Sequence, residues 1–184
     1  MKKTAVIFPG IGYHTDKPLL YYSAKLAASK GYDIIRISYP PCEVNLKEAD
    51  SSQISAFVKE CLAAVNAALK DKDLTSNDEI LFISKSIGTA IAAAYALSID
   101  HPVRHVFFTP LEETFAYVFK GCGIAFNGTD DSWADCATVA GLCKGMDIPL
   151  TTIEGANHSL ETGDVEKDTE TIHDVMKSIA KVMA

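Results

Sequence analysis

The sequence lacks the long apolar segment that a membrane-spanning helix requires. None of its apolar runs approaches the roughly 18 consecutive residues needed to cross a bilayer. The N-terminal Met-Lys-Lys-Thr leads into an apolar run within residues 4–8, which is too short for a signal-peptide core and is followed by no cleavage site. We therefore expect a cytoplasmic protein that does not associate with membranes.

Paired cysteines, clustered histidines and basic patches are also missing. The five cysteines form an odd set without a Cys-x-x-Cys pair, so we interpret them as small buried side chains in a reducing compartment. The scattered histidines include no i, i+4 pair on an expected helix, which argues against a metal site. A formal net charge of −7 without a basic cluster argues against nucleic acid as a partner.

No linker rich in Pro, Gly or Ser and no internal repeat divides the chain. Its 184 residues suit one domain, 1–184. Strand-like runs rich in Val, Ile and Phe recur along the chain, and helical stretches separate most of them. These runs lie at 4–8, 32–38, 79–84, 103–108, 122–127 and 148–153. The alternation predicts an α/β fold with a mostly parallel sheet of about six strands.

Apolar residues at helical spacing predict the helices between these strands. The clearest helix covers 51–70, with Asp50 and Ser51 as candidate caps. Similar stripes precede Gly31, begin at Trp133 and run near the C-terminus from Ile172. The segment 109–121 is compatible with either a short helix or a loop. Cover of the sheet by helices on both faces would make a three-layer α/β/α sandwich.

Ser86 is the candidate nucleophile. The apolar strand 79–84 runs through Ser84, Lys85 and Ser86 into the Ala-rich helix that begins near Ile87. A side chain exposed at such a corner needs a strained backbone and small neighbours two residues away, and Ser84 and Gly88 are small. The start of a helix also favours negative charge on a substrate oxygen. Ser-x-Ser-x-Gly is weak alone, because serines in such turns often only cap helices.

A base and an orienting acid follow later in the chain. Asp130 and Asp131 come after the strand 122–127, and His158 comes after the strand 148–153. Loops beyond the carboxyl ends of parallel strands meet at one edge of the sheet, where open α/β folds bind ligands. A serine, a histidine and a carboxylate at that edge have the chemistry of nucleophilic acyl transfer.

In this order and setting the chain resembles the α/β-hydrolase superfamily over nearly its whole length. The resemblance assigns Ser86 as nucleophile and His158, within Gly155-Ala156-Asn157-His158, as base. It assigns Asp131, in Gly128-Thr129-Asp130-Asp131, as the acid, with Asp130 as a close rival. It also implies the strand order 2-1-3-4-5-6. The chain has no room for the family's two additional N-terminal strands or for its cap domain, so we expect a small, capless hydrolase with an open site.

The segment Phe8-Pro9-Gly10-Ile11-Gly12-Tyr13-His14 resembles the family's oxyanion loop. By that match the backbone N–H of Ile11 is one oxyanion donor, and the N–H of Ile87, directly after the nucleophile, is the other. Pro9 stands where the family often has histidine. His14 is either a supporting group beside this loop or an exposed side chain.

Four further residues are candidates for substrate contact: Gly12, Tyr13, Lys85 and Trp133. Lys85 either points to solvent or favours acidic substrates through its charge. The aromatic residues Tyr13, Tyr39 and Trp133 could wall the site, although Trp133 also fits a helix stripe that faces the sheet. Residues 109–121 are the candidate cover.

Together these features predict a serine hydrolase that cleaves small esters or thioesters through an acyl-enzyme, with no metal or organic cofactor. A peptidase or carbon–carbon hydrolase with the same residues is an alternative, as is a non-catalytic binding protein, because this fold hosts several functions. We expect a small-molecule acyl substrate and a monomer or homodimer. The apolar stretch around Phe115, Tyr117 and Phe119 is a candidate dimer surface.

Overall fold

A computed structural model describes residues 1–42, 45 and 48–183 of the chain. Its centre is a six-stranded sheet in the order β2-β1-β3-β4-β5-β6, in which every neighbouring pair is parallel. The strands are β1 (Lys3–Phe8), β2 (Tyr32–Arg36), β3 (Glu79–Lys85), β4 (Val103–Phe108), β5 (Gly123–Gly128) and β6 (Leu150–Ile153). The expected strand order is confirmed, and β3 lies near the middle of the sheet.

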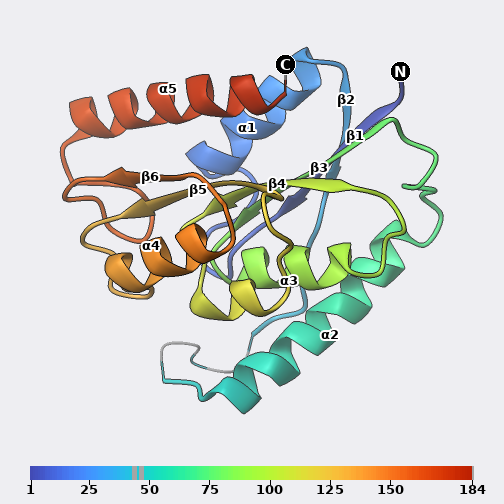
Figure 1. Ribbon diagram of the computed structural model, residues 1–184, viewed down its shortest axis with the longest axis horizontal. Helices are drawn as coiled ribbons and strands as arrows, with labels where there is room; N and C mark the ends of the chain where they lie inside the picture. Colours follow the sequence, from blue (N-terminus) through green and yellow to red (C-terminus); the bar gives the residue numbers. More distant parts are fainter. Residues whose placement is uncertain (43–44, 46–47, 184) are drawn as a thin grey trace.

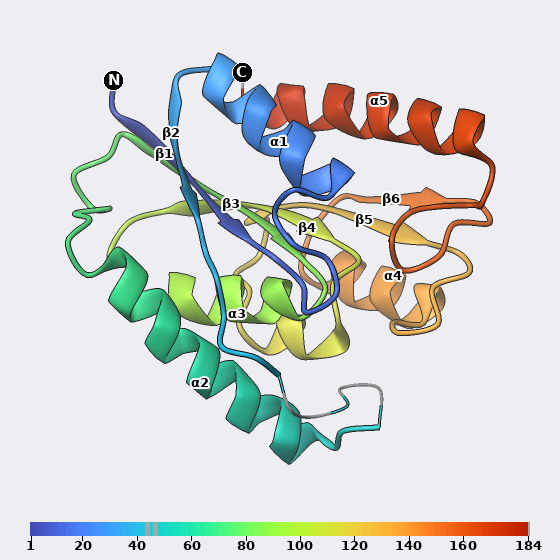
Figure 2. The same ribbon diagram turned by 180° about the vertical axis from the view of Figure 1, so that it is seen from behind.

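Helices cover both faces of this sheet, as the three-layer prediction requires (Figures 1 and 2). One face carries α1 (Pro18–Ser29) and α5 (Val165–Val182), and the other carries α2 (Ser51–Leu69), α3 (Ile87–Ala96) and α4 (Cys136–Gly145). Each face has its own apolar core. Phe82, Cys61 and Val65 belong to the α2–α3 side, whereas Leu81, Leu20 and Ile179 belong to the α1–α5 side. Successive β3 residues thus face opposite layers.

Local chemistry explains where the helices begin. Asp50 accepts hydrogen bonds from the N–H groups of Ser52 and Gln53, and the Gln53 side chain accepts one from the Asp50 N–H, which completes a capping box for α2. Pro18 opens α1, where its missing N–H would have no intrahelical partner. Asp50 was an expected cap, and its role in α2 is confirmed.

Three expectations need correction or refinement. Trp133 does not begin a helix stripe, because α4 starts at Cys136 after the N-cap Asp135, whose side chain accepts the Thr138 N–H at 2.8 Å. Segment 109–121 combines both expected forms, since a short 3₁₀ helix, η1 (Glu112–Ala116), lies within a loop. Of the five cysteines, Cys61 and Cys143 are buried while the other three are only partly buried.

Candidate active site

Ser86 lies at a sharp turn between β3 and α3. Its backbone has φ 56° and ψ −129°, a left-handed conformation that is strained for a residue with a side chain. The Ser86 N–H donates to the Phe108 carbonyl at 3.0 Å, and its carbonyl accepts the Thr89 N–H at 2.8 Å. These bonds hold the turn so that the Ser86 side chain leaves the sheet edge, as the sequence pattern predicted.

Glycine at position 88 is required by the close approach of another loop. A Cβ at Gly88 would lie only 2.2 Å from the Pro9 carbonyl oxygen and 2.7 Å from that of Phe8. The end of β1 therefore packs directly against the first turn of α3. This contact brings the loop that contains Ile11 next to Ser86, and both residues line the same cavity.

His158 connects Ser86 to a buried carboxylate. Its Nε2 lies 2.8 Å from the Ser86 Oγ, and its Nδ1 lies 2.8 Å and 2.9 Å from the two oxygens of Asp131. Asp131 also accepts the N–H groups of Trp133 and Ala134 at 2.8 and 3.2 Å. The Asp131 side chain is 0% exposed, so nearly all its hydrogen bonding is internal.

The structure also distinguishes the two neighbouring aspartates. Asp130 accepts a hydrogen bond from the Thr129 hydroxyl at 3.0 Å and is exposed, whereas Asp131 turns inward to His158. In the structure Asp131, and not Asp130, therefore contacts His158, and the role of Asp131 as the acid stays a prediction.

Backbone contacts between two loops hold His158 over Asp131. The Asp130 N–H donates to the Ala156 carbonyl at 3.0 Å, and the Thr129 hydroxyl accepts the Gly155 N–H at 2.7 Å. A Cβ at Gly128 would lie 2.0 Å from the Ala156 carbonyl oxygen, so only glycine permits this approach at the end of β5. The loops after β5 and β6 therefore behave as one packed unit.

Electrostatics in this cluster favour an ionised carboxylate beside a neutral imidazole. Burial raises the pKa of Asp131. The hydrogen bond and charge of His158, together with the two backbone N–H donors, lower it by more than burial raises it, so the net shift is downward. Burial lowers the pKa of His158, and the positive charge of Lys85 adds to that effect against the opposing influence of Asp131. A neutral histidine can accept a proton from Ser86.

The cluster opens into a cavity of about 220 Å³. Its lining includes the expected substrate contacts Gly12, Tyr13, Lys85 and Trp133, in addition to the residues discussed above. Trp133 is 43% exposed and its ring stacks on that of His158, with centroids 5.5 Å apart. It therefore forms part of the cavity wall instead of packing on the sheet.

Lys85 does not point to solvent. It is 1% exposed, and its Nζ donates to the Thr109 hydroxyl at 2.6 Å while lying 5.1 Å from the centroid of the Tyr13 ring. The solvent interpretation of Lys85 is therefore wrong. A charged side chain is expected to be exposed on average, but the last residue of a central strand is enclosed by the neighbouring strands and the loops above them.

Comparisons with known proteins establish the fold. No family model and no curated protein matches this sequence, but many solved structures resemble its fold. Est1E from Butyrivibrio proteoclasticus superposes with a TM-score of 0.68 at 12% identity, over 98% of this chain and 88% of that one. An α/β serine hydrolase homologue from Coxiella burnetii gives 0.65 at 16%, over 96% and 84%. An α/β serine hydrolase without a lid from Xanthomonas campestris gives 0.61 at 12%, over 97% and 81%.

The chain has the α/β-hydrolase fold. In that fold, the turn at Ser86 and the loops after β5 and β6 meet at the carboxyl edge of the sheet, and the structure places the candidate residues there. Within the described ranges, no helix has the length and apolar character to cross a membrane. The same residues contain no group of three or more His, Cys, Asp or Glu side chains suited to a metal ion.

Several site features were not predicted from the sequence. Ser159 lines the cavity beside His158, and Thr109 supplies the partner of Lys85 from the loop after β4. Thr109 has φ 42°, a strained value that no sequence pattern indicates. Residues 109–121 do not line the cavity, so the expectation that they cover it is wrong. Tyr39 instead lines an adjoining cavity of about 300 Å³ on the other side of Gly10 and Ile11.

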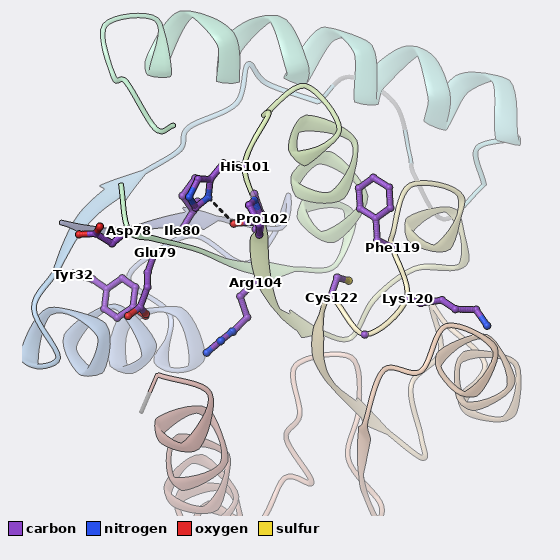
Figure 3. Close-up of a pocket in the computed structure, with 12 residues that line it drawn as sticks. Tyr32, Asp78, Glu79, Ile80, His101, Pro102, Arg104, Phe119, Lys120 and Cys122 are labelled. Carbon is purple, nitrogen blue, oxygen red and sulfur yellow. Dashed lines mark hydrogen bonds between the residues drawn. The ribbon is translucent and has the colours of Figure 1, made fainter. Parts of the chain in front are cut away.

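A larger cavity of about 590 Å³ lies at the opposite, amino-terminal edge of this α/β-hydrolase sheet (Figure 3). Tyr32 and Glu79 lie together on one side of it, joined by a hydrogen bond of 2.5 Å, while Lys120 projects away on the other. Arg104 extends between them and donates to the Val182 carbonyl. This cavity lies at the first residues of β3 and β4, whereas Ser86 follows the last residue of β3, so the length of the strands separates the two.

His14, a candidate supporting group, lies near the oxyanion loop but is exposed. Its Nδ1 contacts the N–H and carboxylate of Asp16 at 3.3 and 3.8 Å. The exposed alternative for His14 is therefore confirmed. His105, in contrast, is fully enclosed between Phe82 and Phe107, and burial lowers its pKa to about 3. It is a neutral member of the core.

Proposed function

We propose that the protein is a serine hydrolase that cleaves small ester or thioester substrates through an acyl-enzyme. The observation that carries this proposal is the continuous contact from the Ser86 Oγ through His158 to Asp131, at 2.8 Å on each side of the imidazole, beside an open cavity. Solved serine hydrolases of the same fold support the reaction class.

In the proposed mechanism, the His158 Nε2 accepts the Ser86 hydroxyl proton as the Ser86 Oγ attacks the substrate carbonyl carbon. The backbone N–H groups of Ile11 and Ile87 donate to the oxyanion that forms on the carbonyl oxygen. The Asp131 carboxylate accepts the Nδ1–H of His158 and stabilises the imidazolium. His158 then gives its proton to the leaving alcohol or thiol, and a water molecule repeats the sequence on the acyl-enzyme.

The cavity sets the proposed substrate size. Its volume of about 220 Å³ falls below the range common for drug-sized ligands, so a short or planar acyl group fits best. The exposed Trp133 ring supplies an apolar wall for such a group. Est1E has been solved with ferulic acid bound, which makes esters of small aromatic acids a reasonable first set of substrates here. The proposed compartment is the cytoplasm.

The test is intact-mass analysis after treatment with a fluorophosphonate. A single adduct on the native protein, absent from Ser86→Ala and slowed by about 10⁴-fold or more in His158→Ala, is expected because the serine needs its base. An adduct that persists in Ser86→Ala would place the reactive nucleophile elsewhere. A native protein that forms none would favour the alternative of a non-catalytic binding protein.

A further inference from the structure

Lys85 is a buried cation that the proposed mechanism does not use. Its Nζ has a hydroxyl partner, Thr109, and an aromatic neighbour, Tyr13, but no carboxylate lies within ion-pair distance of it in the described part of the chain. Burying an ammonium group with so little compensation is unfavourable. Such an arrangement at the residue next to the nucleophile calls for a functional explanation.

Lys85 and His158 line the same cavity, and the groups that interact with Lys85 lie on the loops that follow four of the strands. Tyr13 follows β1, Thr109 follows β4, Asp131 follows β5, and His158 and Glu161 follow β6. Tyr13 stays neutral, because burial raises its pKa to about 12 even though its hydroxyl accepts the Leu19 N–H, which acts in the opposite direction. The charges of Asp131 and Glu161 therefore act on Lys85, and the charge of Lys85 acts on His158.

We propose that Lys85 is a positioning residue whose ammonium, held by the Thr109 hydroxyl, keeps His158 neutral and able to accept the Ser86 proton at mildly acidic pH. This inference rests on the proposed function and extends it to the pH range of the reaction. The ammonium acts through charge repulsion, because a second positive charge on His158 is unfavourable next to the first.

Lys85 carries its positive charge in the same pH range in which His158 would otherwise become protonated. Burial lowers the pKa of Lys85 to about 7, against the opposing influence of the Asp131 and Glu161 charges. Below about pH 7 the ammonium is therefore present, which is the range in which an unperturbed histidine would become protonated and inactive as a base. Above that pH the amine is neutral, and the repulsion no longer opposes the imidazolium that forms during the reaction.

The test measures the rate of fluorophosphonate labelling from pH 5 to pH 9, with each protein scaled to its own plateau. For Lys85→Met, which keeps the side-chain length but loses the charge, we expect the scaled rate at pH 5.5 to fall about threefold or more, because the pKa of His158 rises. Lys120→Met is the matched control. The Lys120 side chain is 70% exposed and pairs with Asp147, away from the cavity beside Ser86. Loss of its charge should therefore leave the scaled profile unchanged.

Thr109 provides a second variant in case Lys85→Met does not fold. Thr109→Val keeps the branched shape but removes the acceptor of the Lys85 ammonium, so the cation is present over a smaller pH range and the profile should move in the same direction. Thr109→Ser restores the hydroxyl and should restore the native profile. A purely structural role for Lys85 would change thermal stability or the plateau rate without moving the profile.

The outcomes separate this inference from the proposed function. If the native protein forms no adduct at any pH, the proposed function fails. If the native protein labels at Ser86 but folded Lys85→Met and Thr109→Val keep the native scaled profile, the hydrolase proposal stands and the role of Lys85 is wrong. If Lys85→Met is unfolded, Thr109→Val decides the inference by itself.

Discussion

At Ser86, backbone conformation and proposed chemistry depend on each other. A serine at φ 56° is less stable than one in an extended strand, yet this conformation presents the hydroxyl to His158 at 2.8 Å. The strain is tolerated because hydrogen bonds from the neighbouring β4 and from α3 fix the turn. The same edge carries Asp131, whose inward orientation follows from the three groups that donate to it.

The two adjacent aspartates give a direct test at this scale. Asp131→Asn should lower ester turnover by about 10²- to 10⁴-fold, because an amide cannot stabilise the imidazolium and can favour the wrong tautomer of His158. Asp130→Asn is the matched control and should change turnover by less than about threefold, since the Asp130 carboxylate is exposed and accepts its hydrogen bond from the Thr129 hydroxyl, not from His158. Steady-state kinetics on a short-chain aryl ester measure both, and the opposite ranking would assign the acid to Asp130.

At the scale of elements, the site depends on how closely β1, β3 and α3 approach one another. Phe8 pairs in register with Ser84, so the loop after β1 begins level with the turn at Ser86. Gly88 then allows the Phe8 and Pro9 carbonyls to touch the first turn of α3. The proposed oxyanion donors, Ile11 and Ile87, lie on these two segments.

Gly88→Ala is therefore expected to destabilise the protein by about 1–3 kcal/mol, because the added Cβ would overlap backbone atoms that cannot move independently. Gly141→Ala provides the control: Gly141 is also a helical glycine, in α4, but nothing lies within 4 Å of an added Cβ. That variant should gain about 0.5–1 kcal/mol from the higher helix propensity of alanine. Urea unfolding measures both, and equal effects would contradict the packing argument.

At the scale of the whole molecule, two apolar cores share one sheet. Phe82 contacts Phe8, Tyr95 and His105 on the α2–α3 side, while Phe108 stacks on Phe126 on the α1–α5 side. Because both layers pack on the same strands, neither can lose its structure without exposing the sheet that supports the other.

This arrangement predicts that residues 1–184 unfold as one domain in a single transition. Trp133 is the one tryptophan in the sequence and reports on the site edge, whereas far-ultraviolet circular dichroism reports on all helices. The two signals should give the same midpoint in urea. A tryptophan transition at clearly lower urea would show that the loops around His158 open before the sheet, and would disprove a single unit.

Trp133 and Lys85 lie in surroundings that differ from those predicted from the sequence. Trp133 was assigned to a helix stripe because its spacing to Cys136 and Ala140 is helical, but Asp135 caps the helix after it. Asp135, a common N-cap residue directly before the apolar residues of this helix, was an available signal for that boundary. For Lys85 the available signal was its place at the end of a central parallel strand, which outweighs the general preference of lysine for the surface.

The alternation of strands and helices, the parallel sheet and the order of Ser86, Asp131 and His158 along the chain follow from the amino-acid sequence alone. These features depend on apolar periodicity and on turns within a few residues, which are local properties. Three other features depend on tertiary packing: Asp131 faces His158 while Asp130 faces solvent, Lys85 is enclosed beside Thr109, and Trp133 stacks on His158. Those outcomes depend on loops from five parallel strands meeting at one edge, and no local pattern specifies how separate loops pack against each other.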